Sequence, residues 1–391
     1  MSAMRPAIDP EPALDTASLQ ALRGDFLYFN VAGSGPTFPA AQDAAERFRR
    51  WLNEVGMFSH DGYDAYNEVL QETRADLADF LGDPGGASRI ALTQSATDAL
   101  NLVVAGLRLP AGSLIATTAE EHVSALLPAY ARRSRGDRVA VLPYGEAEEF
   151  VAALRRLRPA AVVLSLVSCQ NGRVLDVRAV TQHARETGAV VIVDAAQAAG
   201  QIPVDVRSLG ADAVVVLGHK WLHGPLATGA LWVRDPEAFD PPRLGWRSRV
   251  AHDLHGGFEL QPDATRFETG TVDVAAFVGL SQALAIQRAL GSSVGERLRA
   301  LRSALCDRLA GLPFELTSRR EDPTGIVAIV PRSGDAAGIV SRMWTDERMV
   351  VKLLAEPGSP EGIRLSFWAL HLPGDIERLG DAFARQCAVR A

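Results

Sequence analysis

The sequence of 391 residues contains few cysteines, no excess of positive charge and no long apolar run. Its three cysteines follow neither a CxxC spacing nor a Cys/His ligand pattern, so we expect no disulfide framework and no metal site. The 40 Lys and Arg residues against 47 Asp and Glu residues give a net charge of -7, and no basic run stands out. Such a chain has no basic stretch that would bind the phosphate backbone of a nucleic acid, which argues against a nucleic-acid partner.

The sequence also lacks the marks of a membrane or secreted protein. Residues 1–15 have neither a basic n-region nor an apolar h-region, so a signal peptide is not predicted. The longest apolar stretches, 159–167 and 189–193, are too short to span a bilayer. We therefore expect a cytoplasmic protein that is not in a membrane.

What the chain does contain is an alternation of strand and helix patterns in its middle part. Its composition, 47% hydrophobic and 22% charged, is that of an ordinary globular protein with room for about two domains. Residues 161–167, 190–193 and 213–217 are almost continuously apolar, as in strands covered on both faces of a parallel sheet. Further strands are predicted at 90–92, 114–117 and 229–233. The pattern predicts an α/β fold.

The pattern changes after Gly279. It predicts, in order, amphipathic helices over 280–290 and 296–312, strands over 325–330 and 350–354, and a final helix over 375–387. We expect a large α/β domain over residues 38–279. A smaller α+β domain would be formed by residues 1–37 together with 280–391.

An acid, an amide, an imidazole and an amine follow two of the predicted buried strands. Asp194 and Gln197 come after one strand, and His219 and Lys220 come after the next. The carboxyl ends of parallel strands form the ligand crevice of such a sheet. A single lysine such as Lys220 at this place is more often an exposed loop residue. A buried carboxylate such as that of Asp194, however, needs a cationic partner. The protonated ring nitrogen of pyridoxal phosphate (PLP) is such a partner, and the ring is then an electron sink.

Donors for a phosphate are predicted near Thr97. The segment 93–98, TQSATD, lies between a strand and a helix, where backbone N–H groups are free to bind an anion. The same residue types are also common helix caps, so the signal is weak by itself. His122 follows the strand 114–117 and is a candidate to stack on the ring. By itself, however, a histidine at such a place is more often an ordinary surface or core residue.

The run VVIVDAAQAAGQIPVDVRSLGADAVVVLGHKWLHGPLATGALWV, residues 190–233, resembles PLP enzymes of the class V aminotransferase fold. This group holds cysteine desulfurases, kynureninase, isopenicillin N epimerase and cystine C–S lyases, and the similarity extends over nearly the whole chain. The resemblance implies PLP fold type I, with a mostly parallel sheet of seven strands flanked by helices. It also implies that Lys220 binds the cofactor covalently, Asp194 pairs with the ring nitrogen, Gln197 meets the phenolic oxygen and His122 stacks on the ring.

The resemblance assigns phosphate and substrate contacts as well. Ala96, Thr97 and His219 would hold the phosphate, and Gly270 with Thr271 would reach it from a second subunit, which implies a homodimer. Arg364 matches the arginine that grips the substrate carboxylate, a task suited to its bidentate guanidinium. The remaining predicted substrate contacts are Lys352, as a second basic residue, and Asn30, Gly33 and Trp246.

Three positions depart from the family pattern. Leu217 stands where a phosphate-binding Ser or Thr is usual, and Cys169 stands where desulfurases carry an Asn. The Cys169 thiol is either near the ring or simply packed. Desulfurases also carry a cysteine shortly before the carboxylate arginine, and residues 351–364 contain none. Without that nucleophile no persulfide forms in the usual place, which disfavours desulfurase activity.

The segments around Asn30, 56–59 and 245–248 look most like the cystine C–S lyases. We therefore expect β-elimination from cystine or an S-conjugated cysteine, in a natural-product pathway, with Lys220 removing the α-proton. The candidates to line the pocket around the leaving group are His60, Tyr63, Tyr66 and Trp246. Each of them is equally a candidate for a purely structural role. The alternative is another PLP reaction: decarboxylation-coupled oxidative deamination, epimerisation, desulfuration or transamination. A non-catalytic ligand sensor on the same fold is a third reading, which the catalytic residues disfavour.

Overall fold

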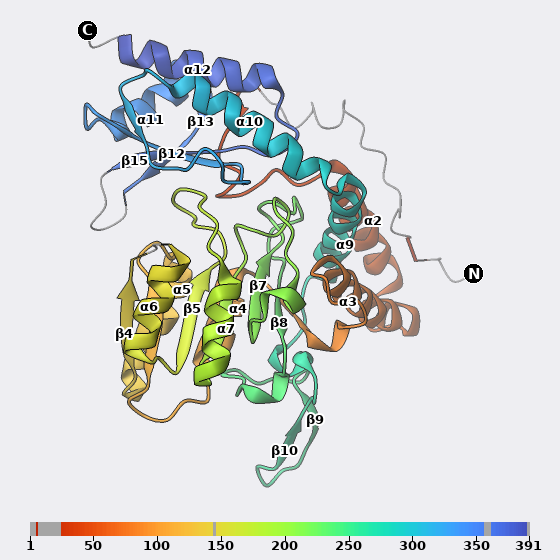
Figure 1. Cartoon of the computed structure of the whole chain (residues 1–391). Coiled ribbons are helices and arrows are strands. Elements are labelled where there is room, and N and C mark those ends of the chain that lie inside the picture. The colour runs from red at the N-terminus through yellow and green to blue at the C-terminus, as the bar shows by residue number, and fades with distance from the viewer. Residues whose placement is uncertain (1–4, 7–24, 144–145, 356–360, 389–391) are drawn as a thin grey trace.

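The structure is a computed structural model that describes residues 5–6, 25–143, 146–355 and 361–388 (Figure 1). Its central feature is a seven-stranded sheet with the strand order β2-β8-β7-β6-β5-β3-β4. The strands are β2 (Ile90–Thr93), β3 (Leu114–Thr118), β4 (Arg138–Leu142), β5 (Ala161–Ser165), β6 (Val190–Asp194), β7 (Ala213–Leu217) and β8 (Gly229–Val233). Only β8 runs antiparallel to its neighbours, so the predicted mostly parallel sheet is confirmed.

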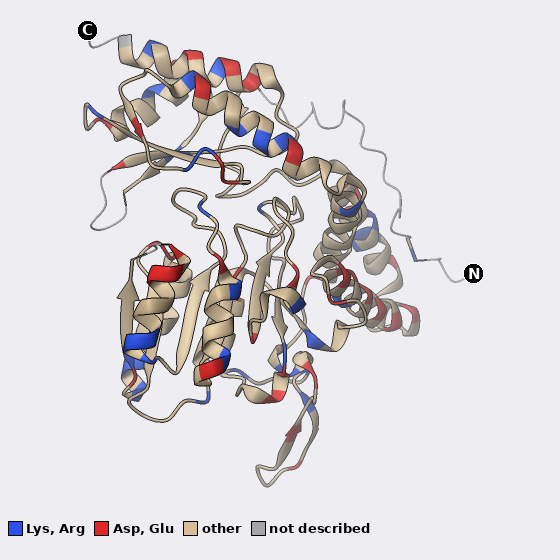
Figure 2. Ribbon diagram, viewed as in Figure 1, with Lys and Arg blue, Asp and Glu red and all other residues tan. Residues whose placement is uncertain are grey.

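The apolar runs form strands because both faces of the sheet are covered. All residues of β5, β7 and β8 are buried. Along β6, Val191 and Val193 pack into one apolar cluster and Ile192 into another, as the two-residue period of a strand requires. Figure 2 shows the charged residues mainly on the helices and loops around this sheet. The helices that accompany it are α4 (Ala96–Ala105), α5 (Val123–Ala131), α6 (Ala147–Leu157), α7 (Val177–Thr187) and the short α8 (Val206–Leu209).

Three long helices pack beside the sheet: α2 (Pro39–Val55), α3 (His60–Phe80) and α9 (Val274–Leu290). The predicted amphipathic helix over 280–290 is part of α9, which starts at Val274 and is buried on all sides as far as Gln287. The amphipathic prediction was wrong because α2 and α3 both pack on α9. Within the described residues no single helix could cross a membrane by length and composition. Only the pair of α9 and α10 (Ser293–Leu309), bent by 76°, passes that test.

The C-terminal part is built on a four-stranded antiparallel sheet. Its order is β11-β12-β15-β14, from β11 (Phe314–Leu316), β12 (Ile326–Pro331), β14 (Lys352–Leu354) and β15 (Gly362–Ser366). The helices α10, α11 (Ala336–Thr345) and α12 (Pro373–Ala388) belong to the same part of the molecule (Figure 1).

The strand predicted over 350–354 is divided in the structure. β13 (Met349–Val350) pairs with β1 (Leu27–Tyr28), whereas β14 pairs with β15. The buried Val351 lies between the two short strands. The pairing of β1 with β13 attaches the N-terminal segment to the C-terminal part. It thereby supports the division at residues 37 and 280, which stays a proposal.

A hairpin of β9 (Arg249–His252) and β10 (Phe258–Leu260) projects from the part of the molecule that contains the seven-stranded sheet (Figure 1). Its apolar residues Val250, Leu254 and Phe258 are exposed, Leu254 to 96%. An apolar surface of this kind is typical of a protein interface.

Candidate active site

Asp194 and Lys220 lie at the carboxyl edge of the central sheet. Asp194 ends β6 and is buried, and its Oδ1 accepts a hydrogen bond of 2.8 Å from the Ala196 N–H. Burial raises the pKa of Asp194, and the positive charges of Lys220 and His122 lower it. Burial likewise lowers the pKa of Lys220, which the charge of Asp194 raises. The structure thus brings together the predicted amine, acid and imidazole.

Gln197 is held by two neighbours. Its Nε2 donates to the Ala32 carbonyl at 2.9 Å, and its Oε1 accepts from the Trp221 indole N–H at 2.8 Å. The amide nitrogen has a second hydrogen, because each side-chain amide carries two donors. The interactions fix the amide between the N-terminal segment and the residue that follows Lys220.

The predicted phosphate and stacking residues are joined by Ser124, which the sequence analysis missed. Thr97 lies in the first turn of α4, and its Oγ1 is 2.7 Å from the Ser124 Oγ. The same Ser124 Oγ is 2.9 Å from the His122 Nδ1, and the Ser124 N–H donates to that nitrogen at 3.2 Å. Nδ1 is therefore an acceptor, which in a neutral imidazole places the proton on Nε2.

His219, the residue directly before Lys220, has a buried ring nitrogen. Its Nδ1 has no hydrogen-bond partner among the described residues, and burial lowers its pKa. A buried polar atom without a partner is costly, and a bound ligand that supplies the partner is one explanation for it. Ala96 is buried at the start of α4, and Leu217 is buried in an apolar cluster without a hydroxyl to offer. The helix N-terminus, the unpartnered nitrogen, the buried acid and the amine together fit PLP.

Arg364 links the small sheet to this edge. Its Nη1 donates to the Cys169 carbonyl at 2.6 Å, and its Nη2 donates to the Asn30 Oδ1 at 3.2 Å. Directly opposite Arg364, across β14 and β15, stands the exposed Lys352. Facing cations in an antiparallel pair repel each other, and an anion between them offsets that cost. A Cβ added at Gly33 would lie 2.8 Å from the Asn30 Nδ2, so a larger residue would displace Asn30.

The Cys169 thiol lies within the electrostatic reach of this cluster. Burial raises its pKa to about 11, and the charges of Arg364 and Lys220 oppose that rise. Its Sγ donates to the Glu120 carbonyl at 3.8 Å. The thiol is therefore near the predicted site and protonated at neutral pH.

Gly270, Thr271 and Trp246 form a separate group. An added Cβ at Gly270 would lie 3.8 Å from the Trp246 Nε1, and Thr271 is exposed. This segment contacts α3, because the Val272 N–H donates to the Tyr66 hydroxyl at 3.0 Å. Tyr66 is fully buried, which favours a structural role for it. Other leaving-group candidates, Tyr63 and His60, are exposed near the start of α3.

A buried acid, Glu121, also escaped the sequence analysis. It precedes His122, and its Oε1 accepts from the Thr118 hydroxyl at 2.6 Å and from the Ser165 N–H at 2.9 Å. Burial raises the pKa of Glu121 to about 7. These hydrogen bonds and the one from the Ser165 hydroxyl lower the pKa, but burial has the larger effect. The only signal in the sequence was an acid directly before the stacking histidine.

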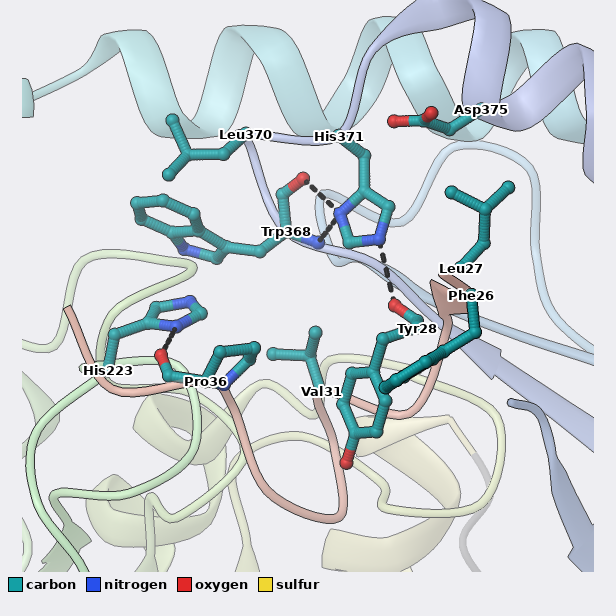
Figure 3. Close-up of a pocket in the computed structure, with 10 residues that line it drawn as sticks. All are labelled: Phe26, Leu27, Tyr28, Val31, Pro36, His223, Trp368, Leu370, His371 and Asp375. Carbon is teal, nitrogen blue, oxygen red and sulfur yellow. Dashed lines mark hydrogen bonds between the residues drawn. The ribbon is translucent and has the colours of Figure 1, made fainter. Parts of the chain in front are cut away.

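A small cleft of about 60 Å³ lies on the N-terminal segment, between Tyr28, His223 and Trp368 (Figure 3). Neither Lys220 nor Asp194 lines it. The His223 ring binds the Pro36 carbonyl through Nδ1 at 2.7 Å, and burial lowers its pKa to about 4. Burial raises the pKa of Tyr28 while the charge of Arg364 lowers it, so this tyrosine both lines the cleft and lies within electrostatic range of the arginine.

Comparisons with known proteins agree with this geometry. The family model described as Aminotransferase class-V matches residues 27–350. A "Probable cysteine desulfurase" of Methanothermobacter thermautotrophicus is 30% identical over 277 residues, covering 68% of this chain and 68% of the relative. One of Xylella fastidiosa is 30% identical over 277 residues, covering 68% and 65%. The match thus spans about two thirds of the length of these curated relatives.

Two solved structures have the same fold. The cystine C–S lyase C-DES, in complex with its reaction product cysteine persulfide, has a TM-score of 0.84 at 23% identity, covering 92% of this chain and 98% of that one. The cysteine desulfurase CsdA from Escherichia coli has a TM-score of 0.85 at 24% identity, covering 97% and 100%.

Proposed function

The chain belongs to the aminotransferase class-V family of PLP-dependent enzymes, and we propose that it is a carbon–sulfur lyase acting on cystine or an S-conjugated cysteine. The reaction would be β-elimination, with a thiol or persulfide, pyruvate and ammonia as products. The observation that carries the proposal is the absence of an activated thiol. Residues 351–364 contain no cysteine, and the Cys169 thiol has a raised pKa. A protonated thiol is a poor nucleophile for sulfur.

The described residues suit the binding of PLP, which supplies an electron sink when it is bound. Lys220 would attach to it, Asp194 would hold the ring nitrogen protonated, and Gln197 would meet the phenolic oxygen. Thr97, His219 and the N-terminal N–H groups of α4 would bind the phosphate. His122, oriented by Ser124, would lie on the ring face.

Lys220 would then act as the general base. Burial lowers the pKa of its amine, so a larger fraction is neutral and able to remove the substrate α-proton. The substrate carboxylate would lie against Arg364, with Lys352 as a second cation. The hydrogen bond from Arg364 to Asn30 holds the guanidinium in place. This arrangement would present the α-proton to Lys220 and leave the Cβ–S bond free to break.

The test is incubation of the PLP-loaded protein with cystine and a panel of S-substituted cysteines, with measurement of pyruvate and of the released persulfide (from cystine) or thiol (from the S-substituted cysteines). We expect both products in equal amounts, and neither with Lys220→Ala. Cys169→Ala should still form both. The absence of pyruvate across the whole panel would refute the proposal.

The relatives named cysteine desulfurases favour desulfuration as the second candidate. That reaction leaves alanine, whereas elimination leaves pyruvate. Mass analysis of the organic product after one turnover distinguishes the two. It would also reveal the carbon dioxide of a decarboxylating reaction.

We also propose a cytoplasmic homodimer in which Gly270 and Thr271 complete the phosphate site of the second subunit. The exposure of Thr271 and of the apolar hairpin residues Val250, Leu254 and Phe258 supports a protein interface there. Light scattering of the purified protein tests it. A dimer is expected, and Leu254→Glu should raise the monomer fraction.

A further inference from the structure

Glu121 is a buried acidic group that the proposed mechanism leaves unused. It lies on the loop between β3 and α5 and is 4% exposed. Three donors meet its carboxylate: the Thr118 hydroxyl, and both the N–H and the hydroxyl of Ser165. Burying a carboxylate is costly even when it is hydrogen-bonded. Such groups are concentrated at functional sites, where the charge is used.

Ser165 connects Glu121 to Asp194. Ser165 is the last residue of β5, and in the parallel register it stands opposite Asp194, the last residue of β6. Because neighbouring strands are about 4.8 Å apart, Glu121 is bound to the residue directly beside the acid that is predicted to pair with the ring nitrogen. Along the chain, Glu121 is also the residue directly before His122.

We propose that Glu121 is a positioning residue that couples the two groups predicted to hold the cofactor ring, the imidazole of His122 and the carboxylate of Asp194. Its hydrogen bonds to Ser165 anchor the loop that carries His122 to the end of β5. Its negative charge, when present, stabilises positive charge on the bound cofactor. The inference rests on PLP binding and does not depend on which bond the enzyme breaks.

The charge of Glu121 changes near neutral pH. Burial raises its pKa to about 7, the hydrogen bonds of Ser165 and Thr118 lower it, and the charge of Asp194 raises it. The carboxyl is thus neutral below about pH 7 and negative above it.

Two titratable groups interact with Glu121 directly, and further charged groups interact with those two. Asp194 faces it from β6, and Cys169 faces it from the loop after β5. Lys220 and His122 face Asp194 in turn, and Arg364 of β15 faces Cys169. The negative form of Glu121 adds to the charge of Asp194, and the two together favour the protonated state of the lysine-bound cofactor.

The test measures the absorbance of the bound cofactor against pH in the PLP-loaded protein. In Glu121→Gln the pH midpoint of the absorbance change should fall by about 0.5 to 1 pH unit, because the negative charge of Glu121 near the cofactor is lost. The dissociation constant of PLP should rise about 3- to 10-fold, the effect of losing one to two hydrogen bonds.

Glu120→Gln is the matched control, since it removes the same charge from the adjacent position. The Glu120 carboxylate binds Ser168 at 2.6 Å and Asn171 at 3.2 Å instead, and the charge of Arg173 acts on it. In Glu120→Gln the pH midpoint of the cofactor absorbance should stay within about 0.2 pH unit of the wild-type value. Equal shifts in the two variants, or no shift in Glu121→Gln, would overturn the proposal.

Ser165→Ala is a second test variant, in which the carboxyl of Glu121 is retained. Loss of the hydroxyl donor raises the pKa of Glu121, so the group stays neutral to higher pH and the cofactor midpoint falls, by less than in Glu121→Gln. This variant decides the question if Glu121→Gln does not fold. A wild-type protein without any cofactor band would refute PLP binding itself, which is a different failure.

Discussion

The two sides of the candidate site are built in different ways. On the side of the proposed large domain, here called the large-domain side, Asp194 ends β6 and Lys220 follows β7, and these two strands are hydrogen-bonded neighbours. On the side of the small domain, Arg364 depends on partners at Asn30 and Cys169, which are 334 and 195 residues away in the sequence. The first side is local in sequence and the second is assembled by folding. We therefore expect mutations on the two sides to affect different measurable steps.

Lys220→Ala should have the largest effect, since the large-domain side carries the chemistry. We expect kcat to fall by about 10³-fold or more, because this substitution removes both the attachment point and the base. The covalently bound cofactor band should vanish from the absorbance spectrum. Turnover that persists at near wild-type rate would show that another residue carries both tasks.

Arg364→Lys should show that the small-domain side acts through the substrate. The single ammonium cannot replace the bidentate guanidinium, so kcat/KM should fall about 10²-fold, chiefly through KM. The cofactor spectrum should be unchanged. An altered spectrum would place Arg364 in contact with the cofactor and weaken the contrast between the two sides.

Lys352→Ala tests the second cation on the same side. We expect KM to rise about 10-fold at low salt, and less as the ionic strength increases, because Lys352 is exposed and its charge is screened. A KM that does not depend on salt in the wild type would argue against an ionic role for this lysine.

Ser124→Ala returns to the large-domain side with a smaller expected effect. Its hydroxyl lies within hydrogen-bond distance of both Thr97 and His122. Its loss should raise the dissociation constant of PLP about 3- to 10-fold and leave the KM for substrate nearly unchanged. Ser124→Thr, which keeps the hydroxyl, is the control. A change in KM alone would mean that Ser124 serves the substrate.

Cys169→Ala should have the smallest effect. The thiol has a pKa raised to about 11, and the bond to Arg364 comes from the backbone carbonyl, which the substitution keeps. We expect kcat/KM within about 3-fold of wild type. A loss as large as that of Lys220→Ala would identify Cys169 as a nucleophile and favour desulfuration.

Much of the large-domain side could be predicted from the sequence. The strands 213–217 and 229–233 have the predicted bounds, and the other predicted strands differ by a few residues at their ends. The edge strand β4 of the same sheet was not predicted. Strands buried on both faces need uninterrupted apolar runs, which are visible in sequence, and polar residues directly after such runs point to the sheet edge. The amine and the acid after β7 and β6 were found in this way.

Other features were missed because their cause is tertiary. The all-round burial of α9 depends on two helices that pack on it, and its own pattern does not reveal them. The buried position of Glu121 depends on Ser165, 44 residues further along the chain. The mostly apolar run 350–354 is compatible with one strand, yet pairing with two different partner strands divides it.

The sequence by itself determined the class of sheet, the position of the acid and amine at its edge, and the absence of a cysteine before Arg364. The sheet and its edge can be predicted locally, because an uninterrupted apolar run is typical of a strand covered on both faces, and the polar residues after it mark its end. Only the tertiary structure decided that Arg364 binds Asn30 and the Cys169 carbonyl, that the thiol is protonated, and that Glu121 is buried beside Asp194. Burial and hydrogen-bond partners set these properties, and both come from residues distant in the chain.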